Sequence, residues 1–310
     1  MSRLSRRTSG LTLTCVLFWV FSAGFAVAQD IEPRRWTNMP VGTNVLGVGQ
    51  VYTIGDLNVD PTLQLEDADV EMHTTVVSYN HYFSLFGKTA RVDALLPFQS
   101  GRWKGRLAGV KESVRREGLA DPRLRLSVNL VGAPALSREE FREYRKEHSV
   151  DTTVGTAVAV NFPLGQYKDD KLINLGQNRF TIRPQLGVLH TRGPWSFELS
   201  GSIFFFTDND DFFDGKRLEQ DPLYGMQGHV VRTFASTYWV AAGLSYGVGG
   251  ESEIDGEGKD DSKSILLYGA SFGLSITGAQ GVRVGYVRRE TLEDTGIDSH
   301  SFLVSWAARF

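Results

Sequence analysis

The sequence has little cysteine, no strong excess of one charge and, beyond its first thirty residues, no long hydrophobic run. One cysteine in 310 residues excludes a disulfide scaffold and any zinc site built from several cysteines. A formal net charge of -3 gives no electrostatic reason to expect a nucleic-acid partner. After Gln29 no apolar run is long enough for a membrane-spanning helix. The chain is nevertheless 41% hydrophobic and 11% aromatic, which excludes a disordered protein.

The first thirty residues have the pattern of an export signal. Basic residues at the start precede a mainly apolar stretch over residues 11–26, and Ala26-Val27-Ala28 is a small-x-small cleavage motif. We therefore expect a signal peptide over residues 1–28, which is cleaved near Ala28 and directs the chain out of the cytoplasm.

The exported chain has a hydrophobic period of two, which is typical of β-strands with one apolar face. Apolar side chains alternate with small or polar ones from Phe302 to Phe310, and similar alternation covers residues 195–205, 238–246 and 266–276. These segments have about the length that a tilted strand needs to cross a bilayer. Because an open sheet edge finds no hydrogen-bond partner in lipid, such strands must close into a barrel.

The same period predicts twelve strands whose connections alternate in length. Odd-numbered strands are followed mostly by long polar connections and even-numbered ones mostly by tight turns, which is the asymmetry of outer-membrane barrels. The charged segment 136–148 predicts one short periplasmic helix, with Ser137 as N-cap and Glu140 at the capping-box position. The predicted strands are residues 44–56, 69–85, 89–103, 120–130, 151–162, 179–191, 195–207, 221–234, 237–249, 264–276, 282–291 and 298–310.

These patterns predict an all-β protein in the outer membrane of a Gram-negative bacterium. An antiparallel up-and-down transmembrane barrel is expected over residues 44–310, preceded by a periplasmic segment over residues 29–43. A soluble secreted β-sandwich is the alternative, although its strands would be shorter. We expect lipid and lipopolysaccharide around the wall. The terminal Phe310 matches the aromatic residue by which the barrel-assembly machinery recognises its substrates.

Polar residues on the inward faces of the predicted strands have two interpretations, which the sequence leaves open. A basic lining would attract anionic solutes. A network of internal ion pairs would instead hold a narrow barrel rigid, for example with Arg91 beside Asp93 and Arg183 beside Glu198.

The sequence does not call for catalysis, a cofactor or a metal site. No G-x-S-x-G motif lies next to His229, the inward histidine, and no H-E-x-x-H motif occurs. The acidic loops at residues 208–215 and 251–261 lack the spacing of a calcium loop, so we expect them to be solvated.

Three stretches of the chain resemble a known family. Together they are similar to the outer-membrane transporters associated with the meta pathway of phenol degradation, over most of the chain from Asn44. The resemblance implies a β-barrel that passes aromatic or other small hydrophobic compounds across the outer membrane, and it implies no catalytic or binding residues. The stretches are Gly118–Pro122 with Asn129–Leu136, Pro163–Tyr167 with Lys171–Arg179, and Phe206–Asn209 with Gln220–Tyr224 and His229.

We therefore expect a passive outer-membrane channel for small, hydrophobic or aromatic solutes, with no cofactor. An anion-selective porin for acidic saccharides or carboxylates and a lipid-acting outer-membrane enzyme remain as alternatives. Tyr167 and Arg179 either constrict the mouth or fasten a loop to the wall. The candidate residues for the lumen or mouth are Arg91, Asp93, Arg123, Arg125, Tyr167, Arg179, Arg183, Glu198 and His229.

Overall fold

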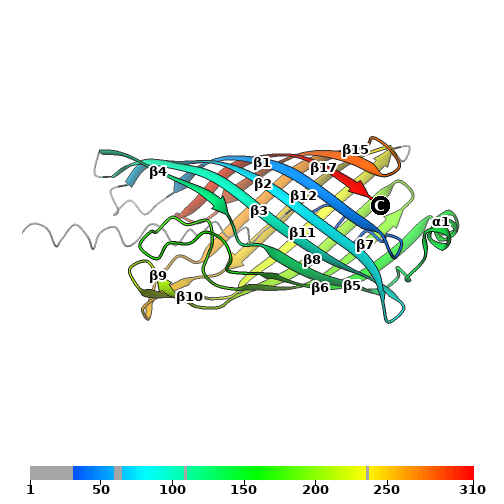
Figure 1. Ribbon diagram of the computed structural model, residues 1–310, viewed down its shortest axis with the longest axis horizontal. Helices are drawn as coiled ribbons and strands as arrows, with labels where there is room; N and C mark the ends of the chain where they lie inside the picture. Colours follow the sequence, from blue (N-terminus) through cyan, green and yellow to red (C-terminus); the bar gives the residue numbers. More distant parts are fainter. Residues whose placement is uncertain (1–30, 59–64, 108–109, 235–236) are drawn as a thin grey trace, which may run out of the picture.

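The chain folds into a closed barrel of twelve antiparallel strands (Figure 1). The structure is a computed structural model that describes residues 31–58, 65–107, 110–234 and 237–310. The signal peptide expected at residues 1–28 lies outside the described residues.

The twelve barrel strands follow one another around the ring in chain order. They are β1 (Asn44–Asn58), β2 (Leu65–Leu85), β3 (Lys88–Leu107), β5 (Arg123–Val131), β6 (Val150–Asn161), β7 (Thr181–Arg192), β8 (Trp195–Phe206), β11 (Leu223–Phe234), β12 (Tyr238–Gly249), β15 (Lys263–Ser275), β16 (Gln280–Thr291) and β17 (Gly296–Arg309). Pairing of β1 with β17, for example Val48 with Trp306, closes the ring. The predicted twelve-stranded barrel is confirmed, because each predicted segment overlaps one of these strands.

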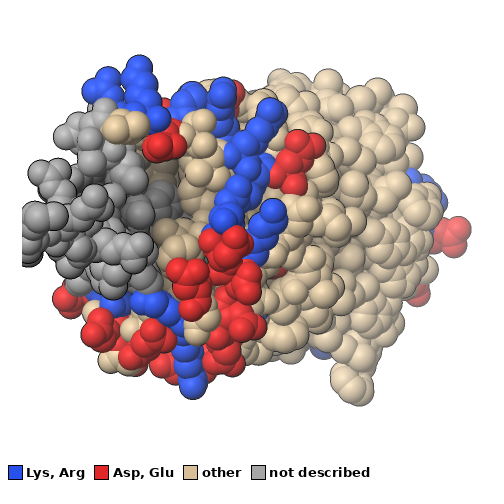
Figure 2. Space-filling model, turned by 60° about the vertical axis from the view of Figure 1, so that its left-hand side comes forward, with Lys and Arg blue, Asp and Glu red and all other residues tan. Residues whose placement is uncertain are grey.

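Alternation along the strands gives the wall an apolar outer face and a mostly polar inner face. On β8, Phe197 and Leu199 are exposed, whereas Glu198 and Ser200 are buried inside. On the face that Figure 2 shows, charged side chains gather at one end and an uncharged band covers the rest of the wall. Moving a large apolar side chain out of water gains roughly 1.5–3 kcal/mol, so rows of such residues stabilise the barrel only in lipid.

The two ends of the barrel differ, and the difference orients it in the membrane. One end has tight turns such as residues 193–194, and both α1 (Arg138–Glu147) and the C-terminus lie there (Figure 1). At the other end, long connections form a small sheet of β9 (Asn209–Phe212), β10 (Lys216–Gln220), β13 (Ser252–Ile254) and β14 (Glu257–Gly258). Short turns face the periplasm in outer-membrane barrels, so the small sheet is extracellular. Within the described part of the chain, no helix is long and apolar enough to cross a membrane.

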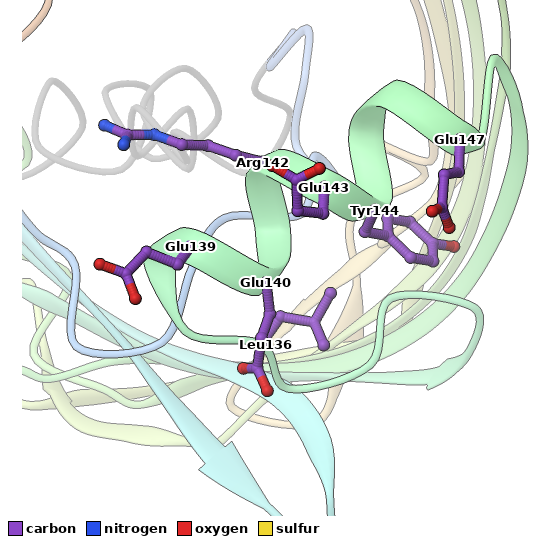
Figure 3. A pocket seen from close by; sticks show the side chains of 7 residues that line it. All are labelled: Leu136, Glu139, Glu140, Arg142, Glu143, Tyr144 and Glu147. Carbon is purple, nitrogen blue, oxygen red and sulfur yellow. The ribbon is translucent and has the colours of Figure 1, made fainter.

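The predicted periplasmic helix is confirmed as α1. Ser137 is its N-cap and completes a capping box, since its hydroxyl accepts from the Glu140 backbone and the Glu140 carboxylate accepts from the Ser137 backbone. These bonds hold the pKa of Glu140 below its usual value. A hollow beside the helix is lined by Leu136 and six helix side chains, four of them glutamates (Figure 3). No residue of the helix is buried, so this hollow is a surface feature at the rim.

The wall has one discontinuity, next to β3. The extracellular part of β3 pairs with β4 (Val110–Leu119), and its periplasmic part pairs with β5. The sequence predicted a single strand over residues 120–130. Instead residues 120–122 separate β4 from β5, and Pro122 has no N–H to donate to a ladder. Among the described residues, no strand pairs with the other edge of β4, because β6 ends at Asn161, opposite Arg123 on β5.

Candidate functional site

The N-terminal segment lies inside the barrel, although we expected residues 29–43 to be a periplasmic segment. The indole of Trp36 is 2% exposed and donates from Nε1 to the Ser200 hydroxyl at 2.7 Å. Further along, the Gly42 N–H donates to the Tyr82 carbonyl near the periplasmic end. Residues 31–36 therefore occupy the lumen, and residues 41–43 lead back to β1.

Small residues on three neighbouring strands make the seat for Trp36. Gly155 of β6 pairs with Gly187 of β7, which pairs in turn with Ser200 of β8. A Cβ at Gly155 would lie 2.5 Å from the indole ring, and a Cβ at Gly187 would collide with it. The ring fits flat against the wall because these two positions carry no side chain.

Glu32 of the N-terminal segment anchors a cluster of ion pairs to the wall. Its carboxylate lies 2.8 Å from Nη1 of Arg125 and 3.1 Å from Nη2 of Arg123. Asp93 joins the cluster at 2.9 Å from Nε of Arg125 and 2.7 Å from Nε of Arg91. The predicted network of internal ion pairs is therefore present at Arg91 and Asp93, and it holds the segment as well as the wall.

Electrostatics inside this cluster favour the charged form of Glu32. Burial alone would raise the pKa of its carboxyl, but the positive charges of Arg125, Arg123 and Arg183 outweigh burial and lower the pKa far below its usual value. The carboxylate therefore stays ionised over the physiological pH range and keeps its arginine partners.

Glu198 holds the backbone of the same segment, which corrects its predicted pairing with Arg183. The Glu198 carboxylate accepts from the backbone N–H groups of Arg34 at 2.7 Å and Arg35 at 3.3 Å. It lies opposite Leu189 on β7, whereas the Arg183 guanidinium stacks 4.4 Å from the centre of the Phe204 ring. The predicted Arg183–Glu198 pair is wrong because the register places these residues at different heights of the barrel.

The outer part of the lumen is lined by apolar side chains instead. Val70 of β2 lies opposite Trp103 of β3, and both point inward and are buried. The cluster that we call the apolar lining consists of Leu57, Val70, Met72, Trp103, Ala120, Leu175 and Ile297, with Ala68 and Ile173 packed against it. Two of these residues, Leu175 and Ile173, come from the long loop after β6 rather than from the wall.

That loop, residues 162–180, covers the free edge of β4 and is fastened at the break in the wall. The Asp121 carboxylate accepts from the backbone N–H groups of Gly165 and Gln177, each at 2.9 Å. Burial raises the pKa of Asp121, and these two hydrogen bonds oppose that effect. The Gln166 N–H donates to the Leu119 carbonyl at 2.7 Å, so the loop takes the place of a neighbouring strand.

The predicted mouth residues Tyr167 and Arg179 fasten this loop at its outer side. The Tyr167 hydroxyl donates to the Asp211 carbonyl at 3.1 Å and accepts from the Asn209 amide at 2.9 Å. The Arg179 guanidinium hydrogen-bonds to Gln220 and stacks 4.7 Å from the centre of the Phe206 ring. Burial lowers the pKa of Arg179 to about 10, so it remains a cation at neutral pH.

The family described as "Putative MetA-pathway of phenol degradation" matches residues 51–298. The chain belongs to this family. Its matched region runs from β1 to β17 and includes the apolar lining, the loop at residues 162–180 and most of the ion-paired wall. No match was found among the curated proteins.

A solved structure shares the fold, and a second is similar to a lesser degree. The COG4313 outer membrane channel from Pseudomonas putida F1 is 22% identical, with a TM-score of 0.75 over 91% of this chain and 100% of that chain. The β domain of the Bordetella autotransporter BrkA is 11% identical, with a TM-score of 0.46 over 86% of this chain and 99% of that chain. The first of these similarities shows that the chain shares the fold of an outer-membrane channel.

The described part of the lumen holds serines and a buried histidine. His229 is buried, and its Nδ1 lies 3.9 Å from the Glu198 carboxylate. Two G-x-S-x-G motifs, around Ser245 and Ser271, lie in mid-strand rather than at a strand-to-helix turn. Ser271 accepts a hydrogen bond from Arg283 at 3.2 Å. Within the described residues, no three His, Cys, Asp or Glu side chains are grouped as a metal site.

Proposed function

We propose that this protein is a passive outer-membrane channel for small hydrophobic or aromatic solutes, without a cofactor or a catalytic step. The observation that carries the proposal is the apolar lining. Interiors of membrane barrels are ordinarily polar, so an inward cluster of Trp103, Met72 and Val70 requires a reason. Burial of an apolar solute against such side chains would gain roughly 25 cal/mol for each Å² removed from water.

The loop at residues 162–180 covers this apolar surface and must move before a solute can bind there. Leu175 and Ile173 of the loop sit on the wall residues of the apolar lining. Their side chains occupy positions that an apolar solute would take after the loop moves. The loop joins the wall through hydrogen bonds at Asp121 and at the edge of β4, and such contacts can break and reform at moderate cost.

The polar part of the lumen argues against an open water-filled pore. Residues 31–36 occupy it, and Glu32 and Asp93 pair with arginines of the wall. Three of the arginines that would make an anion-selective porin, Arg91, Arg123 and Arg125, are thus engaged in ion pairs. A solute that leaves the apolar lining for the periplasm must pass this segment, so we infer that the segment shifts during transport.

Family membership supports the choice of solute. The family is described by its link to a pathway of phenol degradation, and the Pseudomonas putida F1 structure that shares the fold is named an outer membrane channel. We also propose that Phe310, whose side chain is 64% exposed while its backbone pairs with Asn44, is the residue read by the barrel-assembly machinery.

Two loop variants test the proposal. Leu175→Asn places a polar side chain in the apolar lining, whereas Leu172→Asn changes the same loop where it packs against the small extracellular sheet. We expect Leu175→Asn to raise the initial rate of labelled phenol or toluene uptake by cells severalfold, because the loop then leaves the wall residues of the apolar lining more easily, with Leu172→Asn close to wild type. Equal uptake by both variants, at equal amounts of folded barrel, would refute the role of the apolar lining.

A further inference from the structure

The outer surface of β3 and β4 carries a concentrated set of positive charges beyond the lipid-facing rows. Arg102, Lys104 and Arg106 alternate outward on β3, and Lys111 and Arg115 do the same on β4. All five side chains are exposed. We call these five residues the basic face. In Figure 2, Lys and Arg side chains form a stripe across the extracellular end of the wall, with Asp and Glu side chains beside it.

Register places like charges directly opposite one another on the basic face. Arg102 pairs across the ladder with Arg115, and Arg106 pairs with Lys111. Like charges in such positions destabilise a sheet. An anion that lies between two such cations relieves their repulsion.

Carboxylates on β2 and β4 compensate part of the basic face. On β2, Asp69 lies 3.6 Å from Lys104, and Glu71 and Glu66 are in register with Arg102 and Arg106. On β4, Glu117 follows Arg115 on the same face, opposite Ser100 of β3. Across the β3–β4 ladder, Arg115 and Lys111 lie opposite cations, so this part of the basic face keeps its excess of positive charge.

The height of the basic face is set by the apolar residues below it. Phe98 of β3 lies opposite Leu119 of β4, and their side chains are 42% and 43% exposed on the lipid side. Four residues separate Phe98 from Arg102, which corresponds to roughly 9 Å along the membrane normal for a strand tilted by about 45°. The cations therefore begin at the level of the lipid head groups in the outer leaflet.

From this arrangement we propose that the basic face binds the phosphate groups of lipopolysaccharide, while its acyl chains lie against Phe98 and Leu119. Arginine and lysine form charge-assisted hydrogen bonds with phosphate oxygens, and clusters of such residues beside a membrane recognise anionic lipid. An anionic head group between Arg102 and Arg115 would turn their repulsion into two attractions. The site faces sideways into the leaflet, which selects a lipid over a soluble anion.

Lipid A binding to the purified full-length barrel in a neutral, phosphate-free detergent tests this site. The triple variant Arg102→Gln, Lys104→Gln, Arg115→Gln removes three charges from the basic face. Its matched control, Arg138→Gln, Arg142→Gln, Arg145→Gln, removes three charges from α1 at the periplasmic end. We expect bisphosphorylated lipid A to bind the first variant at least about tenfold more weakly than wild type, and the control within about twofold. Equal binding by the two variants would overturn the proposal.

Two further arms separate this site from its alternatives. Dephosphorylated lipid A should bind all three proteins equally weakly, and wild-type preference for it would overturn the proposal. Inorganic phosphate alone should leave the melting temperature of the barrel unchanged. A stabilisation by phosphate equal to that by lipid A would identify a free-anion site instead.

The single variant Arg115→Gln keeps the test valid if the triple variant folds poorly. Without lipid A its melting temperature should equal or exceed that of wild type, since the substitution removes repulsion with Arg102. With lipid A it should gain less than wild type. A lower melting temperature in the absence of lipid A would show that Arg115 stabilises the fold itself and would contradict the proposal.

Discussion

The two parts of the lumen are built from the same kind of strand but have opposite linings. Toward the periplasm, inward residues such as Asp93, Arg125 and Glu198 bind the charged N-terminal segment. Toward the outside, inward residues such as Val70 and Trp103 pack against apolar side chains of a loop.

This difference indicates that the two parts of the lumen have different roles along the path of a solute. The polar part is closed by ion pairs, which require a specific geometry. Removing one partner leaves a buried charge uncompensated, at a high cost in free energy. The apolar part is closed by contacts that an apolar solute can replace without leaving a buried charge unpaired. The lumen can therefore admit an apolar solute at the mouth while it stays closed to ions further in.

The largest effect is expected from Glu32→Gln. The substitution removes the carboxylate that pairs with Arg123 and Arg125. We expect the free energy of unfolding to fall by roughly 2–3 kcal/mol, below the value for a fully buried pair because a quarter of the Glu32 side chain is exposed. In planar bilayers the variant should show a severalfold higher conductance and a reversal potential that indicates anion preference, since the loss of the Glu32 charge increases the excess of luminal arginines over carboxylates.

A suitable control is Glu140→Gln, which changes an exposed glutamate on α1. It should leave both conductance and ion selectivity at the wild-type level. Wild-type conductance in Glu32→Gln would contradict the assignment of the N-terminal segment as the closed part of the path.

Gly187→Ala should have the next largest effect, because it acts on the seat of Trp36 without changing any charge. The added methyl group would collide with the indole, whereas Gly201→Ala, on the neighbouring strand, adds a methyl group toward open space. Crowding of this kind costs roughly 1–3 kcal/mol. We expect Gly187→Ala to raise the conductance and the rate of protease cleavage within residues 31–38. Gly201→Ala should do neither, and an equal response of the two variants would refute the packing argument.

A smaller and more local effect is expected at the loop. Asp121→Ala removes the acceptor of two backbone hydrogen bonds, at a cost of about 1–2 kcal/mol. Hydrogen exchange at residues 162–180 should accelerate, with the ion-paired wall unchanged. Asp170→Ala in the same loop, where the carboxylate pairs with Lys171 on the surface, is the control. Acceleration spread evenly over the barrel would show that Asp121 supports the wall rather than the loop.

The smallest response is expected from pH. A carboxyl whose pKa is lowered by folding contributes stability above its unfolded pKa and loses it only as pH falls through the lower folded value. Because arginines hold the pKa of Glu32 well below its usual range, the Glu32 carboxylate should keep its charge and make no contribution to a change in conductance between about pH 7 and pH 5. A rise in conductance with a midpoint near the ordinary glutamate pKa would show that the carboxylate is not paired in the membrane.

The strands could be predicted from the sequence because a bilayer imposes both their length and their alternation. β4 could not, since its outer face carries Lys111 and Arg115 where the lipid-facing rule requires apolar residues. The strands of the small extracellular sheet were missed because each has only two to five residues. The capping box of α1 is a local signal, and it was predicted correctly.

Contacts between distant segments were harder to predict from the sequence. The inward positions of Arg91 and Asp93 followed from strand parity, and their pairing followed from their spacing. The insertion of residues 31–36 into the lumen has no periodic signal, because its contacts with Gly187 and Ser200 span more than 150 residues. The pairing of Arg183 with Glu198 was wrong for a related reason, since parity gives the face of a residue but not its height.

Selectivity of uptake by intact cells tests the central claim most directly. Initial rates for labelled toluene and labelled xylose, at equal low concentrations, would be compared in cells with and without the wild-type protein. The account predicts that the protein raises the toluene rate severalfold and leaves the xylose rate unchanged. A protein that raises the xylose rate and leaves the toluene rate unchanged would contradict it.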